Sequence, residues 1–394
     1  MRFENCSNDV LYPVISDFKD KVGQMIVCFL LTHVPNPRIN KRIEVYKGNA
    51  EIHVICTRRA SQNIWEPSQD VDYIIFDIDL PSANHIIKRY IISRDYQKKA
   101  LEKLKELKPN VIYTEGLDSL LIAGEYKKQH NARVIYEVAD LRKNYITKPT
   151  KLKEKLLTAA LLKKERDAFQ YVDYLVVTSP KFYDIHYHTL ISKEKTLFIP
   201  NAPDTSVFKE YHKKKGGVFT VGFIGGIRYL KQMKMLVDAA NEVGCNVLFA
   251  GAGGTNSDYQ EIHDYCKNMP NVTFTGRYDY NTEIAKLYGM VDCVYAVYDA
   301  DNPNVRIALP NKLYESIFCE LPIIVAKGTY LAELVEEWEV GVAVIYNDKL
   351  ELINILKKFK SNIHYRIQFA EKCKLVKENP DMNANNEHLK DFVL

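Results

Sequence analysis

The sequence lacks several features that would assign it to a special class of protein. Its eight cysteines form no C-x-x-C pair, its amino end is polar rather than a secretory leader, and the longest apolar run near that end, Met25–Thr32, is too short to span a bilayer. Cys28, Cys56 and Cys293 lie in apolar stretches, where a free thiol behaves as a small hydrophobe. We therefore expect a cytoplasmic protein without disulfides.

A strong net charge and metal-binding motifs are also lacking. The net charge of +4 is modest, and no platform of aromatic and basic residues is present, so we exclude nucleic acid as a partner. His263 and Cys266 lack the second ligand pair of a zinc site. Asp-x-Asp pairs begin at Asp77 and Asp299, and we interpret them as a strand end and a loop. We therefore expect neither a metal nor another cofactor.

What the sequence does have is a regular alternation of short apolar runs and helix-length segments. Runs that are apolar on both faces are typical of parallel strands covered by helices, and the alternation predicts doubly wound α/β sheets. Helical spacing of apolar residues predicts helices over Tyr96–Leu107 and Leu230–Val243. The predicted strands are Met25–Thr32, Glu51–Thr57, Val71–Ile78, Asn110–Thr114, Arg133–Val138, Asp173–Ser179, Val218–Ile224, Asn246–Ala250, Asn271–Thr275, Asp292–Tyr298, Pro322–Ala326 and Gly341–Ile345.

The pattern restarts near residue 210, which predicts two domains. Pro200 and the polar stretch 212–217 have the composition of a linker, and a new strand follows them. We therefore assign 1–209 to one Rossmann-like domain and 210–375 to a second. Sheets of this kind bind ligands beyond the carboxyl ends of their strands, so we expect a cleft between the two domains.

Glycines follow the predicted strands of the second half. Gly225 and Gly226 come directly after one strand, and Gly251 and Gly253 come after the next. Glycine lets backbone N–H groups approach a phosphate, and the start of the following helix favours negative charge. Plain tight turns would need the same glycines, so the pattern alone leaves both interpretations open.

Basic residues accompany the first of these turns. Arg228 and Lys231 follow it within one helical turn and can neutralise a diphosphate. In residues 309–326, LPNKLYESIFCELPIIVA, Pro310 suits the first turn of a helix on which Lys312 and Glu315 share a face. Such a helix start could hold a nucleotide, with the carboxylate on the ribose hydroxyls. The alternative is an exposed Lys–Glu pair.

Taken in order, these motifs resemble those of the family 4 retaining glycosyltransferases with the GT-B fold. The last of them matches the PNKLYE variant of bacterial polysaccharide-biosynthesis members. The resemblance covers roughly residues 25–378 and is dense from 195 to 345. The matching segments are IPNAPDTSVF (199–208), VGFIGGIRYLKQMKMLVDAA (221–240), LFAGAGG (248–254), NVTFTGRYDYNTEIAKLYGMVDCVYAVY (271–298) and PNKLYESIFCELPIIVA (310–326).

The resemblance implies two domains that face each other across a cleft. The acceptor is bound by 1–209 and the nucleotide-sugar donor by 210–375, while a helical segment, 376–394, packs back on the N-terminal domain. Glu315 would hold the donor ribose, and Arg228 and Lys231 would stabilise the departing diphosphate without a metal. The implied donor-binding set is Gly225, Gly226, Gly251, Gly253, Asn311, Lys312, Leu313 and Glu315.

Two positions depart from the family pattern. Ile307 stands where the first glutamate of the E-x7-E motif would be, and Ala139 stands where a histidine usually contacts the sugar. We expect Asp140 to replace that histidine as a catalytic residue. The polar loop 299–306 is a candidate for the missing glutamate's sugar contact.

The N-terminal half supplies the acceptor side. His33 and Arg38 follow the first strand, where acceptor loops lie in this fold. Residues 147–166 combine leucines at helical spacing with six lysines, so they predict a helix that contacts an anionic membrane or, equally, an ordinary surface helix.

We therefore expect a glycosyltransferase that moves a sugar, from a UDP-sugar rather than a GDP-sugar, with retention. The acceptor would be a saccharide or a polyprenyl-diphosphate-linked saccharide at the inner face of the membrane, in cell-surface polysaccharide synthesis. The alternative is a catalytically silent nucleotide-sugar-binding partner of another transferase. A sugar-nucleotide epimerase is disfavoured because its carboxylates and histidines are not apparent.

Overall fold

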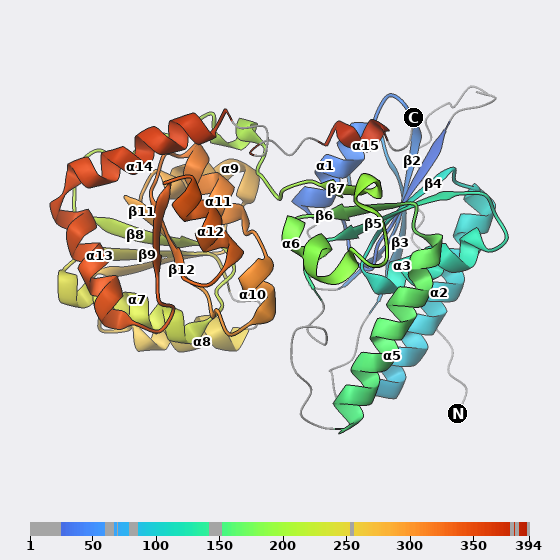
Figure 1. Cartoon of the computed structure of the whole chain (residues 1–394), viewed down its shortest axis with the longest axis horizontal. Coiled ribbons are helices and arrows are strands. Elements are labelled where there is room, and N and C mark those ends of the chain that lie inside the picture. The colour runs from blue at the N-terminus through green and yellow to red at the C-terminus, as the bar shows by residue number, and fades with distance from the viewer. Residues whose placement is uncertain are drawn as a thin grey trace. The chain divides into compact units, whose positions relative to one another are not determined.

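The computed structural model describes residues 25–59, 67–68, 70–78, 86–141, 152–252, 256–378, 382 and 386–391. The chain forms two compact units (Figure 1). Unit 1 comprises Met1–Ile199 with Asn385–Leu394, and unit 2 comprises Pro200–Ala384. The division lies slightly before residue 210, where the composition of the linker had placed it.

Unit 1 is built on a seven-stranded parallel sheet with the order β3-β2-β1-β4-β5-β6-β7. The strands are rich in Val, Ile and Tyr and are buried on both faces at the centre of the sheet, as parallel strands require. The strands are β1 Ile26–Leu30, β2 Glu51–Arg58, β3 Asp72–Asp77, β4 Val111–Glu115, β5 Arg133–Val138, β6 Tyr174–Val177 and β7 Thr196–Phe198.

Helices cover both faces of this sheet, because the chain winds outward from β1 in one direction and then from β4 in the other. Helix α3 contacts both α2 and α5, and α1 contacts the carboxyl-terminal helix α15 (Figure 1). The Tyr46 hydroxyl donates a hydrogen bond to the Leu389 carbonyl (3.5 Å), so the end of the chain returns to the N-terminal unit. The helices are α1 Pro37–Tyr46, α2 Ile86–Leu107, α3 Leu117–Lys127, α5 Leu152–Ala168, α6 Pro180–Phe182 and α15 His388–Asp391.

Unit 2 repeats this plan with a six-stranded parallel sheet, in the order β10-β9-β8-β11-β12-β13. Its central strands are fully buried, and aromatic rings such as Phe223, Phe249 and Phe359 fill the core. The strands are β8 Thr220–Ile224, β9 Asn246–Ala250, β10 Val272–Gly276, β11 Cys293–Ala296, β12 Ile323–Ala326 and β13 Gly341–Val344.

The helices of unit 2 also lie on both faces of their sheet. Helix α7 contacts α8 and α13, and α14 contacts α11 and α13 (Figure 1). The helices are α7 Leu230–Val243, α8 Asn256–Tyr265, α9 Tyr280–Tyr288, α10 Pro303–Ile307, α11 Asn311–Phe318, α12 Tyr330–Glu337, α13 Lys349–Ser361 and α14 Ile363–Val376.

The predicted fold class is confirmed, with small corrections to individual elements. The predicted bounds of β5, β9 and α7 are those observed. The short strand β7 was not predicted, because its three half-buried residues give too little pattern. Pro310 was expected inside the first turn of α11 but is the residue that precedes it, in an extended conformation. The seven described cysteines are buried and free, and burial raises the pKa of the Cys28 thiol to about 12.

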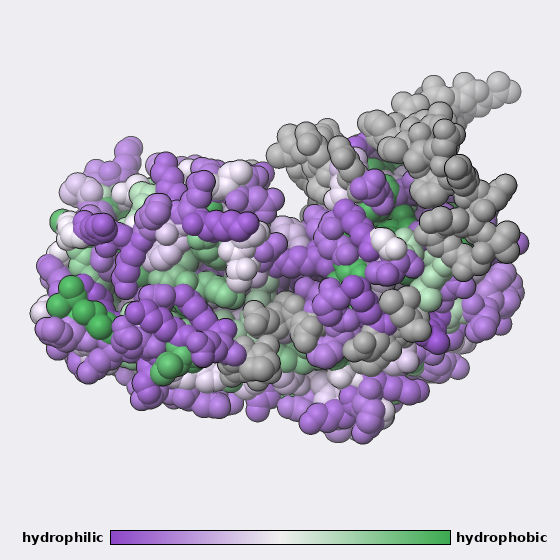
Figure 2. All heavy atoms as spheres, turned by 90° about the horizontal axis from the view of Figure 1, so that it is seen from above, coloured by the Kyte–Doolittle hydropathy of each residue, from purple (hydrophilic) through white to green (hydrophobic). Residues whose placement is uncertain are grey.

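Among the described residues, no helix is both long and apolar enough to cross a bilayer. On the face seen in Figure 2, hydrophilic side chains cover most of both units, and apolar side chains show as small separate patches.

Candidate functional site

Each sheet has a position where the direction of winding reverses, and the candidate site residues gather at these two positions. In unit 2 the reversal lies between β8 and β11, and in unit 1 it lies between β1 and β4. The chain leaves the carboxyl ends of such a strand pair in opposite directions, which opens a crevice where α/β proteins bind ligands.

Two glycine turns form the floor of the unit 2 site. Gly225 follows β8 with φ of +134°, and Gly251 follows β9 with φ of +129°, so both adopt a backbone conformation that other residues rarely reach. A Cβ atom on Gly251 would stand 2.1 Å from the carbonyl oxygen of Gly225, so the two turns are in direct backbone contact. The Gly225 N–H donates to Ala250, which ties the turns together.

Lys312 lies over this floor. It is the second residue of α11, and its side chain is buried, with the residue 8% exposed. Its ammonium group is 4.4 Å from the centre of the Phe223 ring and 5.7 Å from that of Tyr298, and a Cβ atom on Gly225 would come within 2.8 Å of it. Aromatic faces stabilise a cation without neutralising it, so this charge remains available to an anion.

Glu315 lies one turn further along α11 and is 3% exposed. One carboxylate oxygen accepts a hydrogen bond from the Tyr280 hydroxyl (2.8 Å) and the other accepts one from Tyr288 (2.6 Å). Burial and the Glu315 charge raise the pKa of both phenols, which keeps them as donors. The alternative of an exposed Lys–Glu pair is therefore wrong, since Lys312 and Glu315 are both buried with separate partners.

The remaining predicted donor residues differ in exposure. Arg228 and Lys231 are exposed beside the Gly225 turn, with Gly226 exposed between strand and helix. Asn311 is half-buried at the start of α11. Leu313 is fully buried in the core, so only its backbone could meet a ligand. Gly253 lies outside the described residues.

The position of the missing glutamate is apolar in three dimensions as well as in sequence. Ile307 ends the short helix α10 and is 8% exposed. The loop before it is held by its own polar groups, because Asn302 caps α10 and Asp301 accepts a hydrogen bond from the Tyr346 hydroxyl (2.6 Å). The apolar side chain of Ile307 cannot take the role of the missing carboxylate.

In unit 1, a residue that the sequence analysis singled out pairs with one that it did not. His33 follows β1, and Glu115 ends β4, so the reversal of the sheet brings them together, with Nε2 3.3 Å from the carboxylate. Arg38, in the first turn of α1, also pairs with Glu115. Burial opposes protonation of His33, but its hydrogen bond to Glu115 and that residue's charge outweigh burial and raise the pKa of the imidazole.

A second carboxylate lies deeper in unit 1. Glu137, near the end of β5, is fully buried and pairs with the guanidinium groups of Arg38 (3.0 Å) and Arg42 (3.3 Å). The Tyr113 hydroxyl donates to its other oxygen (2.5 Å). Two cations and one phenol therefore satisfy the buried charge, as a carboxylate without water requires.

Glu115 and Glu137 border a cavity of about 260 Å³ inside unit 1. Asp140 and Ala139 lie on its wall, directly after β5, and Arg38 lines it from α1. Tyr136 donates to the buried carboxylate of Glu165 (2.8 Å), which also borders the cavity. The structure thus brings Arg38 and Asp140, two residues singled out from sequence, to one hollow. No sequence pattern indicates Glu165, whereas an acidic residue at the end of an apolar strand is a signal by which Glu115 could have been found.

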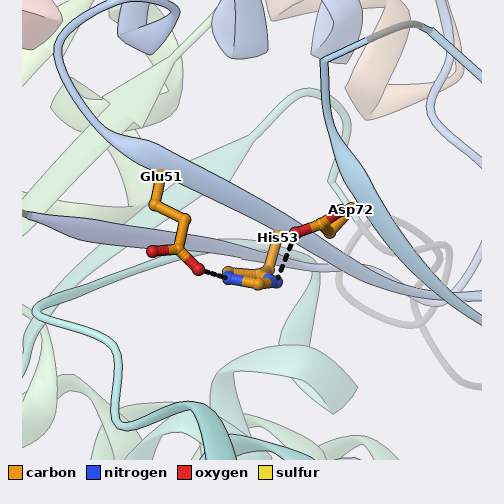
Figure 3. Close-up of side chains that lie close together, drawn as sticks. All are labelled: Glu51, His53 and Asp72. Carbon is orange, nitrogen blue, oxygen red and sulfur yellow. Dashed lines mark hydrogen bonds and ion pairs between the residues drawn. The ribbon is translucent and has the colours of Figure 1, made fainter. Parts of the chain in front are cut away.

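A different group of possible metal ligands lies at the opposite edge of the unit 1 sheet. Figure 3 shows His53 between Glu51 and Asp72, near the amino ends of β2 and β3. The Glu51 carboxylate is 2.7 Å from Nε2 and the Asp72 carboxylate is 3.7 Å from Nδ1. One ligand atom from each residue lies within 4.8 Å of the others, but each ring nitrogen already faces a carboxylate, and we interpret the group as a bridge between two strands.

The helix expected to contact a membrane is α5, although residues 147–151 of that prediction lie outside the described part of the chain. Its side chains are largely exposed, and Leu152 and Leu156 are 71% and 63% exposed. Leucines and lysines alternate around the helix and do not form separate faces, so the amphipathic arrangement expected from sequence is not observed.

Comparisons with known proteins agree with this geometry. Residues 218–362, which contain the Gly225 turn and α11, match the family described as Glycosyl transferases group 1. The succinoglycan biosynthesis protein ExoL of Rhizobium meliloti is 22% identical over 270 residues, and the match spans 65% of this chain and 66% of that relative, just under two thirds of each.

Solved structures share the whole architecture. A sucrose-phosphate synthase from Thermosynechococcus elongatus superimposes with a TM-score of 0.69 at 15% identity, covering 93% of this chain and 97% of its own. Anabaena HepE in complex with UDP gives a TM-score of 0.66 at 15% identity, covering 93% and 98%. The chain therefore has the two-domain GT-B fold, and residues 218–362 of its second unit match the glycosyl transferases group 1 family.

Proposed function

We propose that this protein transfers a sugar from a nucleoside diphosphate sugar, with UDP as the nucleotide, to a saccharide acceptor in cell-surface polysaccharide synthesis. The observation that carries the proposal is the Lys312 ammonium group, which is held by two aromatic rings over the Gly225 and Gly251 turns. The switch point and the family match of residues 218–362 support it. HepE, a structural neighbour with UDP bound, and ExoL support the choice of UDP and of a polysaccharide product.

In this proposal the cations of unit 2 stabilise the leaving group. Breaking the bond between the sugar and the diphosphate places negative charge on the departing oxygen. Lys312 and the backbone N–H groups at the start of α11 meet that charge in positions fixed before the reaction, and the exposed Arg228 and Lys231 add positive charge beside them. No metal is required in this scheme, because protein cations supply the positive charge.

We propose that Glu315 contacts the donor ribose together with the tyrosines that surround it. The carboxylate is already bonded to Tyr280 and Tyr288, so a ribose hydroxyl would bind at a remaining lone pair or replace one phenol. Either arrangement keeps the negative charge fixed at one place. Discrimination against nucleotides that lack a ribose hydroxyl would follow.

The unit 1 cavity is the proposed site for the acceptor or for the transferred sugar. Asp140 would contact the sugar where a histidine is usual in the resembling family, and Arg38 would line the same hollow. Transfer with retention fits a donor phosphate that accepts the acceptor proton on the same face of the sugar. A lipid-linked acceptor would bring the enzyme to the membrane, where the exposed lysines of α5 would meet anionic lipid although the helix has no separate apolar face.

The test is donor turnover without acceptor, followed by ³¹P and ¹H NMR. With UDP-glucose, we expect slow release of UDP, with α-glucose as the first anomer formed, and loss of this activity in Lys312→Met. Release of β-glucose would contradict retention. UDP-glucose binding without any turnover, with or without saccharide acceptors, would instead favour the silent nucleotide-sugar-binding partner, for which buried Ile307 is the structural argument.

A further inference from the structure

Unit 2 has a hollow of its own, which lies at the edge of the sheet opposite the glycine turns. Its volume is about 780 Å³. Its walls come from residues that precede strands, such as Phe219 before β8, Asp292 before β11 and Pro322 before β12, and from the first turns of α14. Since each strand rises by about 3.3 Å per residue, a five-residue strand such as β8 separates this hollow from the Gly225 turn by roughly 16 Å.

The hollow is strongly basic. Lys213, Lys214, Lys360 and Arg366 line it, and Asp292 is the sole carboxylate among its described lining residues. Asp292 pairs with Lys214 at 2.9 Å. The other three cations therefore give the hollow a positive charge that its own wall does not cancel.

The contacts of these cations fix them in place without neutralising them. The Lys360 ammonium group donates to the carbonyl oxygens of Val243 (2.8 Å) and Gly244 (2.9 Å). The Arg366 guanidinium stacks over the Phe219 ring at 5.0 Å. Carbonyl dipoles and aromatic faces orient a cation but leave its net charge, so both groups are prepared to meet an anion.

Apolar side chains border the same hollow. Val218 is 53% exposed, Ile363 is 57% exposed and Ile367 is 43% exposed, which is unusual for three branched residues at one place. A small inorganic anion would use the cations and leave this apolar surface in water. A ligand with an anionic head and a hydrocarbon chain would cover both.

We propose that this hollow binds a phosphate-bearing lipid, with the phosphate at Lys360 and Arg366 and the chain along Ile363 and Ile367. The site is separate from the nucleotide-sugar site, and the proposal does not depend on the transferase activity. Charge complementarity and the exposed apolar border select this class of ligand over a free anion.

The test is isothermal titration calorimetry of the full chain with dihexanoyl phosphatidylglycerol below its critical micelle concentration. Dihexanoyl phosphatidylcholine and inorganic phosphate are the comparison ligands. We expect the phosphatidylglycerol to bind, with Lys360→Gln combined with Arg366→Gln weakening it roughly thirtyfold, since each basic group contributes about 1 kcal/mol near anionic lipid. Lys286→Gln combined with Lys349→Gln, which removes two exposed charges elsewhere in unit 2, should leave the affinity unchanged.

A second variant guards against loss of folding, because Lys360 also contacts the end of α7. Ile367→Glu adds a carboxylate at the exposed border and should also weaken lipid binding at least roughly tenfold by repulsion. The proposal is overturned if phosphate binds as tightly as the lipid, if phosphatidylcholine binds equally, or if the matched control loses as much affinity as the cavity variants. Absence of lipid binding by the wild type overturns it as well, whatever the outcome for UDP.

Discussion

The two units have the same topology, but the charged side chains at their switch points have opposite kinds of partner. In unit 2, the Lys312 ammonium group lies over aromatic rings, and the Glu315 carboxylate accepts hydrogen bonds from two tyrosine hydroxyls. Each charge is therefore held by neutral groups. In unit 1, Arg38 pairs with two carboxylates, Glu115 and Glu137, so the charges compensate one another.

This difference indicates which unit is prepared for an anion. A charge that is held by neutral groups stays uncompensated and can attract a diphosphate. Charges that are paired with each other mainly stabilise the local structure. A polar cavity with its charges already paired suits the neutral hydroxyls of a sugar. The comparison therefore supports our proposal that unit 2 stabilises the leaving group and that unit 1 recognises sugar hydroxyls.

The largest expected effect is the loss of the buried carboxylate of unit 1. Glu137→Leu leaves the largely buried Arg38 and the fully buried Arg42 without their shared anion. We expect the free energy of unfolding of unit 1 to fall by about 3–5 kcal/mol. Urea denaturation followed by circular dichroism measures this change, and a loss below about 1 kcal/mol would show that the pairing does not hold the cavity.

A glycine substitution tests the turn beneath Lys312. Gly225→Ala places a Cβ atom 2.8 Å from the ammonium group and forces alanine to φ of +134°. We expect a loss of about 1–3 kcal/mol of stability and strongly weakened UDP binding. Gly226→Ala is the matched control, since its Cβ would meet only Arg228 at an ordinary 3.7 Å. Equal effects of the two variants on UDP binding would disprove the role of the turn.

Replacing the carboxylate of unit 2 should cost less stability than replacing that of unit 1. Glu315→Gln removes a charge but keeps an amide oxygen and adds donors for Tyr280 and Tyr288, so we expect a loss of about 1–2 kcal/mol. Thermal denaturation of both glutamate variants in parallel decides the order. A greater loss for Glu315→Gln than for Glu137→Leu would reverse the comparison.

The smallest effect concerns pH. The pKa of His33 is raised in the folded protein, so its pairing with Glu115 stabilises fully below the ordinary pKa of 6.5 and is lost as the pH rises through the raised value. His33→Gln should therefore lower the melting temperature more at pH 5.5 than at pH 8.5. The group is partly exposed, so the difference should stay below about 1 kcal/mol. An equal or larger difference at pH 8.5 would contradict the pairing.

The sequence predicted unit 2 better than unit 1 for a physical reason. The Gly225 turn and the Lys312–Glu315 helix are local patterns, and the residues that form each lie a few positions apart. In unit 1, Tyr113, Glu137 and Arg42 contact one another but come from three separate elements, β4, β5 and α1. The spacing of residues in the sequence does not predict contacts between such distant segments. Topology places such side chains together only once the order of the strands is known.

Even in unit 2 the partners of predicted residues could not be foreseen. Glu315 was expected to face the ribose, but the phenols that hold it come from α9, which precedes β11 in the chain. Lys312 was expected beside a phosphate, but its contacts with Phe223 in β8 and with Tyr298, which follows β11, arise only from tertiary packing.

The most direct test of the account is calorimetric titration of UDP and GDP into the wild type, Lys312→Met and Lys286→Gln. The account predicts that UDP binds more tightly than GDP, that Lys312→Met weakens UDP by at least roughly tenfold, or about 1.4 kcal/mol, and that Lys286→Gln binds as the wild type does. Equal binding of UDP by the wild type and Lys312→Met, or no binding of either nucleotide, would contradict the assignment of the donor site to unit 2.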